Sequence, residues 1–138
     1  MNSRLNQEIR DRRGLAYTVD SNVSLLSDCG TLNIYFGSDP ETADRCAAIV
    51  RREIDRLAQG PLSARTFARV RDQYCGQLLV SSDNRESAAM SLAKSVMYFD
   101  EIHDVNRAIE RVRAVTADDL TDVAQMIASQ TLNRLTLK

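Results

Sequence analysis

The sequence has few of the residue types on which many common sites depend. Its 138 residues include one histidine, no tryptophan, two prolines and three cysteines. Metal sites built from several histidines of this chain are excluded, and so are the helical motifs H-E-x-x-H and H-x-x-E-H, because each needs two histidines. The cysteines (Cys29, Cys46 and Cys75) are odd in number and form no C-x-x-C pair. We therefore expect free, mostly buried thiols, and neither a disulfide framework nor a structural zinc site.

Long apolar runs and an excess of one charge are also lacking. Val96–Phe99 is among the longest apolar stretches, so no membrane-spanning helix is expected. Residues 1–6 contain no apolar signal core. The formal net charge is −1, and the arginines at positions 10, 12 and 13 lie beside Glu8 and Asp11 with no interleaved aromatic residues. These features argue against nucleic-acid binding.

The composition is that of an ordinary globular protein. Apolar residues make up 43% of the chain and charged residues 27%. This length and balance predict a single domain over residues 1–138 with a core of its own.

Hydrophobic periodicity predicts a helix followed by a hairpin. Ser3 can cap a short helix in which Met1, Leu5 and Ile9 recur every four residues, and Gly14 supplies a stop. The period then changes to two, which predicts a strand over 16–26 and a second over 32–36. The turn at 27–30 between them is short, so the two strands should pair as an antiparallel hairpin.

Helical patterns dominate the rest of the chain. Asp39-Pro40-Glu41 predicts a helix start that Gly60-Pro61 ends, and Ser63 should cap a helix with Phe67, Val70, Tyr74 and Leu78 on its inner face. The helical pattern resumes with Ala89, Leu92, Ala93 and Val96, and again around Val105, Ile109 and Val112. Residues 116–119 resemble a capping box before a last helix, and 132–137 predict a strand.

This order of elements predicts an α+β fold, with an antiparallel sheet whose helices pack on one face. Three strands are few for so many apolar helix faces. The sheet is therefore expected to be incomplete.

No recognisable active site emerges from the residue types alone. His103 lies between acids in an expected loop, where a lone histidine is expected to be a surface residue, and no Ser or Cys beside it suggests a triad. No P-loop, G-x-S-x-G or G-x-G-x-x-G motif is present.

Arg10 and Tyr17 are the candidate binding residues. They lie seven apart across the Gly14 turn, and a guanidinium and a phenol that converge there can donate hydrogen bonds to a peptide carbonyl or a developing oxyanion. The alternative is that Tyr17 packs in the core while the nearby arginines pair with Glu8, Asp11 and other acids.

The same segment resembles a known family. Residues 1–5, 8–10 and above all R-G-L-A-Y at 13–17 are similar to the carboxy-terminal homologous domain of pitrilysin/insulinase-type zinc metallopeptidases, which include the mitochondrial processing peptidases. The resemblance continues through the hairpin, the helix at Pro40, Leu78–Val80 and Ala114–Leu120. It therefore covers nearly the whole chain in order.

The resemblance implies a role in proteolysis as part of a hydrolase. In that family two similar domains form a clamshell, in which the amino-terminal one holds zinc and the carboxy-terminal one grips the peptide. Arg10 and Tyr17 match the Arg and Tyr that reach toward the substrate near the scissile bond. The implied partners are a peptide substrate and a zinc-binding amino-terminal domain or subunit, with zinc in the complete enzyme and none in this chain. Alone, the chain is expected to be inactive.

Three further expectations follow from the resemblance. The family domain begins with a strand and helices upstream of the matched segment, so we expect a partial domain whose uncovered sheet edge or helix faces favour a homodimer. Reduced cysteines suit the cytoplasm, whereas family members also occur elsewhere, including the periplasm. An alternative function is a non-catalytic structural or assembly subunit of the same family.

Overall fold

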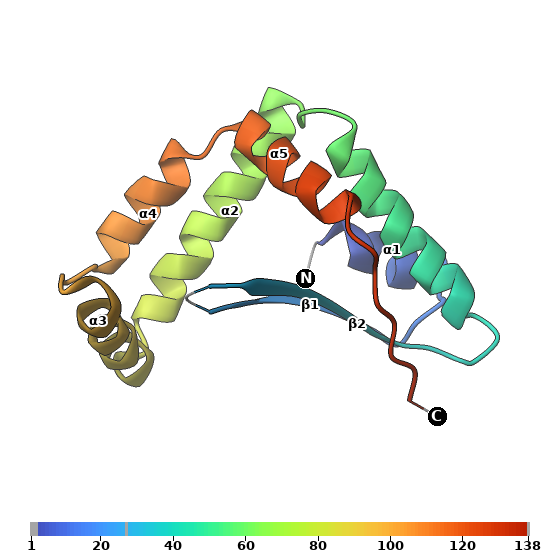
Figure 1. Ribbon diagram of the computed structural model, residues 1–138, viewed down its shortest axis with the longest axis horizontal. Coiled ribbons are helices and arrows are strands. Elements are labelled where there is room, and N and C mark those ends of the chain that lie inside the picture. The colour runs from blue at the N-terminus through green and yellow to red at the C-terminus, as the bar shows by residue number, and fades with distance from the viewer. Residues whose placement is uncertain (1–2, 27, 138) are drawn as a thin grey trace. The chain divides into compact units, whose positions relative to one another are not determined.

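The structure is a computed structural model that describes residues 3–26 and 28–137 (Figure 1). Met1, Asn2 and Ser27, which belong to the expected first helix and turn, lie outside the described residues. The elements in chain order are η1 (Asn6–Asp11), β1 (Thr18–Leu25), β2 (Gly30–Gly37), α1 (Ala43–Ala58), α2 (Ala64–Ser82), α3 (Arg85–Phe99), α4 (Val105–Ala114) and α5 (Ala117–Ala128).

The described residues form two compact units. Unit 1 contains the residues up to Gln59 together with those from Ala124 onward, and unit 2 contains Gly60–Val123. Unit 1 includes η1, the strands and α1, while unit 2 includes α2, α3 and α4. The predicted α+β class is confirmed.

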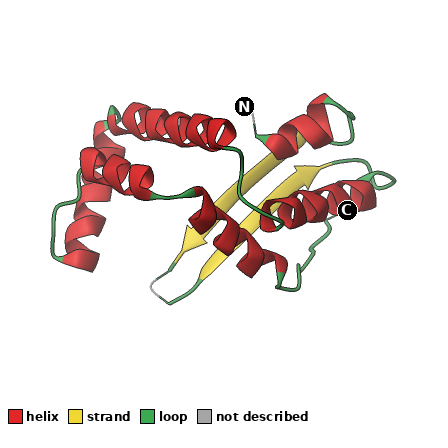
Figure 2. Ribbon diagram, turned by 90° about the horizontal axis from the view of Figure 1, so that it is seen from above, coloured by secondary structure: helices red, strands yellow, loops and turns green. Residues whose placement is uncertain are grey.

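The two strands of unit 1 form the predicted antiparallel hairpin (Figure 2). Val19 lies opposite Phe36 and Val23 lies opposite Leu32. Apolar residues therefore share one face of the hairpin, as the period of two predicted.

The core of unit 1 lies where η1, β1 and α1 meet. Ile9 and Cys46 are fully buried, and around them cluster Leu15, Ala16, Val19, Ile49, Val50 and Ile54. Figure 1 shows η1 and α1 on the same side of the hairpin. The buried Asn6 ties the first helical segment to β1, because its side-chain amide donates a 3.1 Å hydrogen bond to the Val19 carbonyl.

The carboxyl end of α5 packs against this core. Ile127 and Ala128 contact the core cluster. The guanidinium of Arg51 on α1 donates a 2.7 Å hydrogen bond to the carbonyl of Ala128. An arginine at a helix carboxyl end satisfies carbonyls that have no partner within the helix.

Most predicted helix starts are confirmed by their capping bonds. The hydroxyl of Ser3 accepts from the backbone N–H of Asn6 at 3.2 Å, and that of Ser63 accepts from Thr66 at 3.4 Å. Thr116 and Asp119 form the expected reciprocal box, in which the Asp119 carboxylate accepts from the Thr116 N–H at 2.8 Å and the Thr116 hydroxyl accepts from the Asp119 N–H at 3.2 Å.

Two predictions are wrong, namely the last strand and the start of α1. The described residues 131–137 contain no strand, because no neighbouring chain segment supplies a hydrogen-bonding partner, and Leu135 and Leu137 are exposed. Helix α1 begins at Ala43 rather than at Pro40, because Asp39 and Thr42 close a turn first through a 3.0 Å bond between the Thr42 N–H and the Asp39 carbonyl.

The predicted inner face of α2 is only partly covered. Phe67 and Leu78 are half-buried, whereas Val70 and Tyr74 are exposed and Cys75 is the buried residue of this helix. Helical spacing predicts which side chains share a face, but the amount of neighbouring surface decides whether that face is covered.

The three cysteines are free, and two of them are buried as predicted. Cys46 and Cys75 lie in the interior, whereas Cys29 is exposed at the hairpin turn. Among the described helices, none has the length and apolar character that crossing a membrane requires.

Gly14 should be the most sensitive glycine in the chain to substitution. Its φ is +57°, in the left-handed region, so Gly14→Ala should destabilise the fold by about 1 kcal/mol even though open space surrounds the position. Urea unfolding followed by circular dichroism measures this change.

Gly60→Ala is the matched control for that substitution. It also meets open space, and its backbone is not left-handed. We expect its free energy of unfolding to change by less than about 0.5 kcal/mol. Equal effects of the two substitutions would contradict the role of the Gly14 turn.

Candidate functional site

The turn after η1 positions both predicted binding residues. The backbone N–H of Gly14 donates to the carbonyl of Arg10 at 2.9 Å, and the N–H of Leu15 donates to the carbonyl of Ile9 at 2.9 Å. These bonds end the helical segment and direct the chain into β1. Arg10 therefore lies at the end of η1, and Tyr17 lies directly before the strand.

Arg10 is exposed and only loosely paired. Its side chain is 55% exposed, and its Nε lies 3.5 Å from the carboxylate of Asp11. An exposed ion pair of this kind contributes little to stability. The guanidinium is therefore free to rearrange toward a ligand.

Tyr17 is exposed, with its hydroxyl held by an acid. The residue is 71% exposed, and its hydroxyl donates a 2.9 Å hydrogen bond to Oδ1 of Asp39. This bond and the negative charge of Asp39 raise the pKa of the Tyr17 phenol above its ordinary value. The phenol therefore remains a neutral proton donor at physiological pH.

The alternative with Tyr17 in the core is wrong, because its ring faces solvent. The pairing of the neighbouring arginines with acids is confirmed, since Arg12 and Arg13 both bind the carboxylate of Glu8. No hydrogen bond joins Arg10 to Tyr17 within residues 3–26 and 28–137. Their convergence on one ligand atom remains a prediction.

Asp39 is the site residue that sequence reasoning missed. The sequence assigns it to a helix start, whereas its side chain binds Tyr17, 22 residues earlier in the chain. No local pattern encodes a contact between positions so far apart. The nearest signal was an acid three residues after the second predicted strand, near the place where a hairpin returns to the start of the first.

Glu8 anchors the arginines that follow η1. The side chain of Arg13 also donates a 2.6 Å hydrogen bond to the Glu8 backbone carbonyl. Hydrogen bonds from Arg13 and the positive charges of Arg13 and Arg12 hold the pKa of the Glu8 carboxyl below its ordinary value. On α1, the Arg52 guanidinium approaches the same carboxylate at 3.8 Å.

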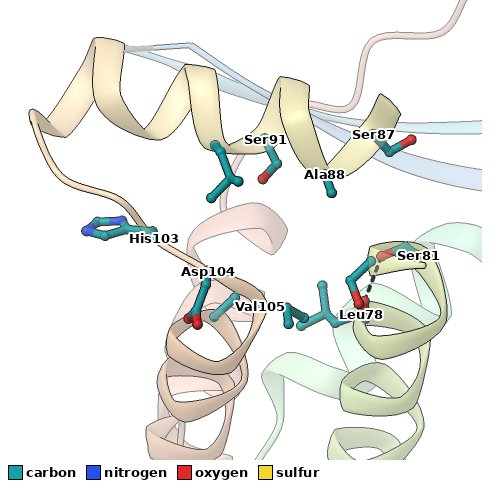
Figure 3. Close-up of a pocket in the computed structure, with 11 residues that line it drawn as sticks. Leu78, Ser81, Ser87, Ala88, Ser91, His103, Asp104 and Val105 are labelled. Carbon is teal, nitrogen blue, oxygen red and sulfur yellow. Dashed lines mark hydrogen bonds between the residues drawn. The ribbon is translucent and has the colours of Figure 1, made fainter. Parts of the chain in front are cut away.

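His103 belongs to unit 2 and lies at the edge of a cavity of about 360 Å³ between α2, α3 and α4 (Figure 3). Its Nε2 lies 3.0 Å from the carboxylate of Glu101, and its ring stacks on Phe99. The imidazole is 18% exposed, so it is more covered than a surface residue. The sequence expectation of a surface histidine is corrected by this packing against Phe99.

The serines around this cavity do not form a catalytic pair with His103. The hydroxyls of Ser81 and Ser82 donate to the carbonyls of Leu78 and Leu79 in their own helix, at 2.8 and 2.7 Å. Figure 3 shows the His103 ring pointing away from Ser81. Ser87 and Ser91 also line the cavity, but among the described residues the imidazole of His103 hydrogen-bonds to the Glu101 carboxylate and to no serine hydroxyl. The contact between nucleophile and base that acyl transfer requires is therefore not formed.

The described part of the chain does not fit a zinc site. No three His, Cys, Asp or Glu side chains of these residues gather where they could hold a metal ion. A single imidazole and acids already paired with arginines are a poor donor set for zinc.

Comparison with known proteins identifies the family. A model described as the Peptidase M16 inactive domain matches residues 1–74, which include η1, the hairpin and α1. The chain belongs to the peptidase M16 family. The resemblance inferred from residues 13–17 is thereby confirmed, and the segment that carries the M16 match includes Arg10, Tyr17 and Asp39.

Several relatives of this M16 domain are zinc proteases by name. It is 33% identical over 125 residues to an uncharacterized zinc protease of Streptomyces coelicolor, covering 91% of this chain and 27% of that protein. It is 23% identical over 130 residues to the uncharacterized zinc protease YmxG of Bacillus subtilis, covering 94% of this chain and 32% of that protein. The chain thus spans about a third or less of these relatives.

A solved structure shares the fold. The periplasmic protease PqqL of Escherichia coli superposes with a TM-score of 0.65 at 18% identity, over 88% of this chain and 14% of that one. At this identity the similarity concerns the fold of the M16 domain and not its substrate.

The Glu8 ion pairs should make the stability of this M16 domain depend on pH. A carboxyl whose pKa is lowered on folding stabilises the fold above its unfolded-state pKa, and this contribution is lost as the pH falls through the lowered folded-state pKa. Glu8→Gln should therefore lower the unfolding midpoint at pH 7. The difference from the original chain should shrink below the ordinary value of 4.5.

Glu41→Gln is the control for loss of one exposed carboxylate. No ion pair to Glu41 is found in the described part of the chain. Its substitution should therefore leave the unfolding midpoint unchanged both at pH 7 and below pH 4.5. An equal, pH-independent effect of the two substitutions would contradict the role of the Glu8 pairs.

Proposed function

We propose that this M16 domain is the carboxy-terminal, substrate-gripping half of a zinc metalloendopeptidase that cleaves peptides. In this proposal Arg10 and Tyr17 hold the peptide and donate hydrogen bonds to its carbonyl, while a separate amino-terminal domain or subunit holds zinc. The observation that carries it is the exposed, neutral phenol of Tyr17. This residue lies directly before β1, within the segment that matches the family.

The chemistry of the two side chains supports this role. A guanidinium and a neutral phenol are both donors at physiological pH, and neither is buried. Donors aimed at a carbonyl oxygen stabilise the negative charge that develops there during hydrolysis. Both residues flank one turn that is closed by backbone hydrogen bonds, which keeps their backbones close together.

The hairpin supports binding of an extended peptide. Within the described ranges, β1 and β2 pair only with each other, so each strand has an outer edge of backbone N–H and carbonyl groups. A peptide that adds to such an edge gains main-chain hydrogen bonds, and its side chains supply specificity.

The proposal assigns no hydrolysis to this chain alone. Its residues bind and orient the peptide, whereas zinc and the general base would come from the partner domain. The isolated chain should therefore be inactive toward peptides.

A non-catalytic assembly subunit is the second candidate function. It is favoured by one observation, namely that the single proton of the Tyr17 hydroxyl is already donated to Asp39. An H-x-x-E-H motif in the polypeptide that completes the clamshell supports the peptidase. Its absence from every partner polypeptide supports the assembly role.

Removal of the Tyr17 hydroxyl tests the peptidase role. In the complete peptidase, Tyr17→Phe should lower kcat for a peptide substrate by about 10²-fold, because one donor to the developing oxyanion is lost. Zinc content, measured by atomic emission, should stay unchanged.

Tyr35→Phe is the matched control, since Tyr35 is also exposed on the hairpin and is 64% accessible. Its kcat should remain within about twofold of the original enzyme. Unchanged kinetics of Tyr17→Phe would remove the proposed role.

We also propose that the exposed apolar end of the hairpin supports a homodimer of the isolated chain. Val23, Leu25 and Leu32 lie on the same face and are 61%, 79% and 40% exposed. Contiguous apolar surface next to open strand edges favours association.

Sizing chromatography with light scattering should therefore give a dimer of the 138-residue chain. Val23→Lys should shift it to the monomer, because a charge replaces an exposed apolar side chain. Ser24→Lys, which adds the same charge on the opposite face of β1, should leave the dimer intact. A monomeric original chain would contradict this association.

A further inference from the structure

We propose that Asp39 is a positioning residue that holds the Tyr17 hydroxyl in the free domain and releases it to the carbonyl of an incoming peptide. This inference rests on the proposed function of Tyr17 and adds a residue that the sequence did not suggest. The bound peptide therefore competes with Asp39 for one hydrogen-bond donor.

The contact joins two segments that are each fixed by backbone hydrogen bonds. The Tyr17 N–H donates to the Gly37 carbonyl at 2.8 Å, which extends the hairpin pairing to Tyr17. The Asp39 carbonyl accepts from the Thr42 N–H at 3.0 Å and lies 3.3 Å from the hydroxyl of Ser38. The carboxylate and the phenol are thus held next to each other by the backbone on both sides.

Thr42 links the turn before α1 to the segment that precedes Tyr17. Its hydroxyl lies 3.0 Å from the carbonyl of Leu15 and 3.1 Å from that of Asp39. The hydroxyl has a single proton, so it serves one of these acceptors at a time. Either bond keeps the turn before α1 close to the segment that leads into β1.

The side chains themselves can exchange partners. Tyr17 is 71% exposed and Asp39 is exposed, so rotation of the phenol breaks no packing in the core. A phenol has one proton to donate. While Asp39 accepts that proton in a hydrogen bond, the same proton cannot be donated to a peptide carbonyl.

The exchange involves no covalent step. The O–H bond of Tyr17 stays intact, and only its acceptor changes from Oδ1 of Asp39 to the peptide oxygen. The raised pKa of Tyr17 agrees with this arrangement, because the nearby carboxylate keeps the phenol protonated and ready to donate. Asp39 thus keeps the donor in its neutral form and lowers its availability in the free domain.

The first test measures the contact without any partner domain. The chain contains four tyrosines, and their ionisation is followed by the ultraviolet absorbance of tyrosinate in an alkaline titration. The component with the highest pKa should disappear in Tyr17→Phe. In Asp39→Asn it should shift toward the ordinary value for tyrosine, because the amide lacks the negative charge.

Asp20→Asn is the matched control for this titration. The substitution removes one exposed carboxylate from β1, and the Asp20 side chain forms no hydrogen bond to Tyr17. Its titration should coincide with that of the original chain. If the Asp39→Asn titration also coincides with it, the inference is overturned.

The second test is a double-mutant cycle in the complete peptidase. Asp39→Ala should lower KM for a peptide by roughly three- to tenfold, because alanine has no side-chain oxygen to accept the Tyr17 proton and the peptide no longer competes for this one hydrogen bond. In the Tyr17→Phe background, the same substitution should change KM by less than about twofold, because Asp39 acts through Tyr17.

The outcomes separate this inference from the proposed function. An unchanged or raised KM in Asp39→Ala overturns the competition, as does an equal KM change with and without the Tyr17 hydroxyl. If Tyr17→Phe has normal kinetics while the titration still shows the contact, the peptidase role of Tyr17 fails and the Asp39 contact itself stands.

Discussion

The reversal of the chain at Gly14 is the constraint on which unit 1 depends. A left-handed residue at this position ends the helical segment, and β1 begins four residues later. Ile9 on one side of the turn and Val19 on the other can then enter the same core. The same geometry leaves Arg10 and Tyr17 exposed on either side of the turn, so the packing of the core and the position of the candidate site have a common cause.

The helices of unit 2 form although few of their side chains are buried. Its helices are well capped, yet Cys75, Ser95 and Ile109 are among its few buried residues, and Val80 and Met97 are 74% and 80% exposed. Local capping is sufficient to fix where these helices begin. Exposed apolar surface of this kind is typical of interaction sites, which agrees with the proposed partner domain.

Features encoded over short distances were predictable. Alternation of apolar residues and a short turn predicted the hairpin. Ser63 and the Thr116–Asp119 box marked helix starts, because these caps join residues three apart. The prediction of a last strand was wrong, since residues 132–137 have the right pattern but pair with no other strand among the described residues. The exposure of Tyr74 was likewise not predictable, because it depends on which surfaces pack over α2.

The α+β class, the hairpin, the family resemblance at residues 13–17 and the choice of Arg10 and Tyr17 as candidates all follow from residue patterns in the chain. Only the tertiary structure decided that the Tyr17 ring faces solvent and that Asp39 accepts its proton in a hydrogen bond. The reason is physical. Propensity and capping act within a few residues, whereas this contact joins two positions that the hairpin brings together from 22 residues apart.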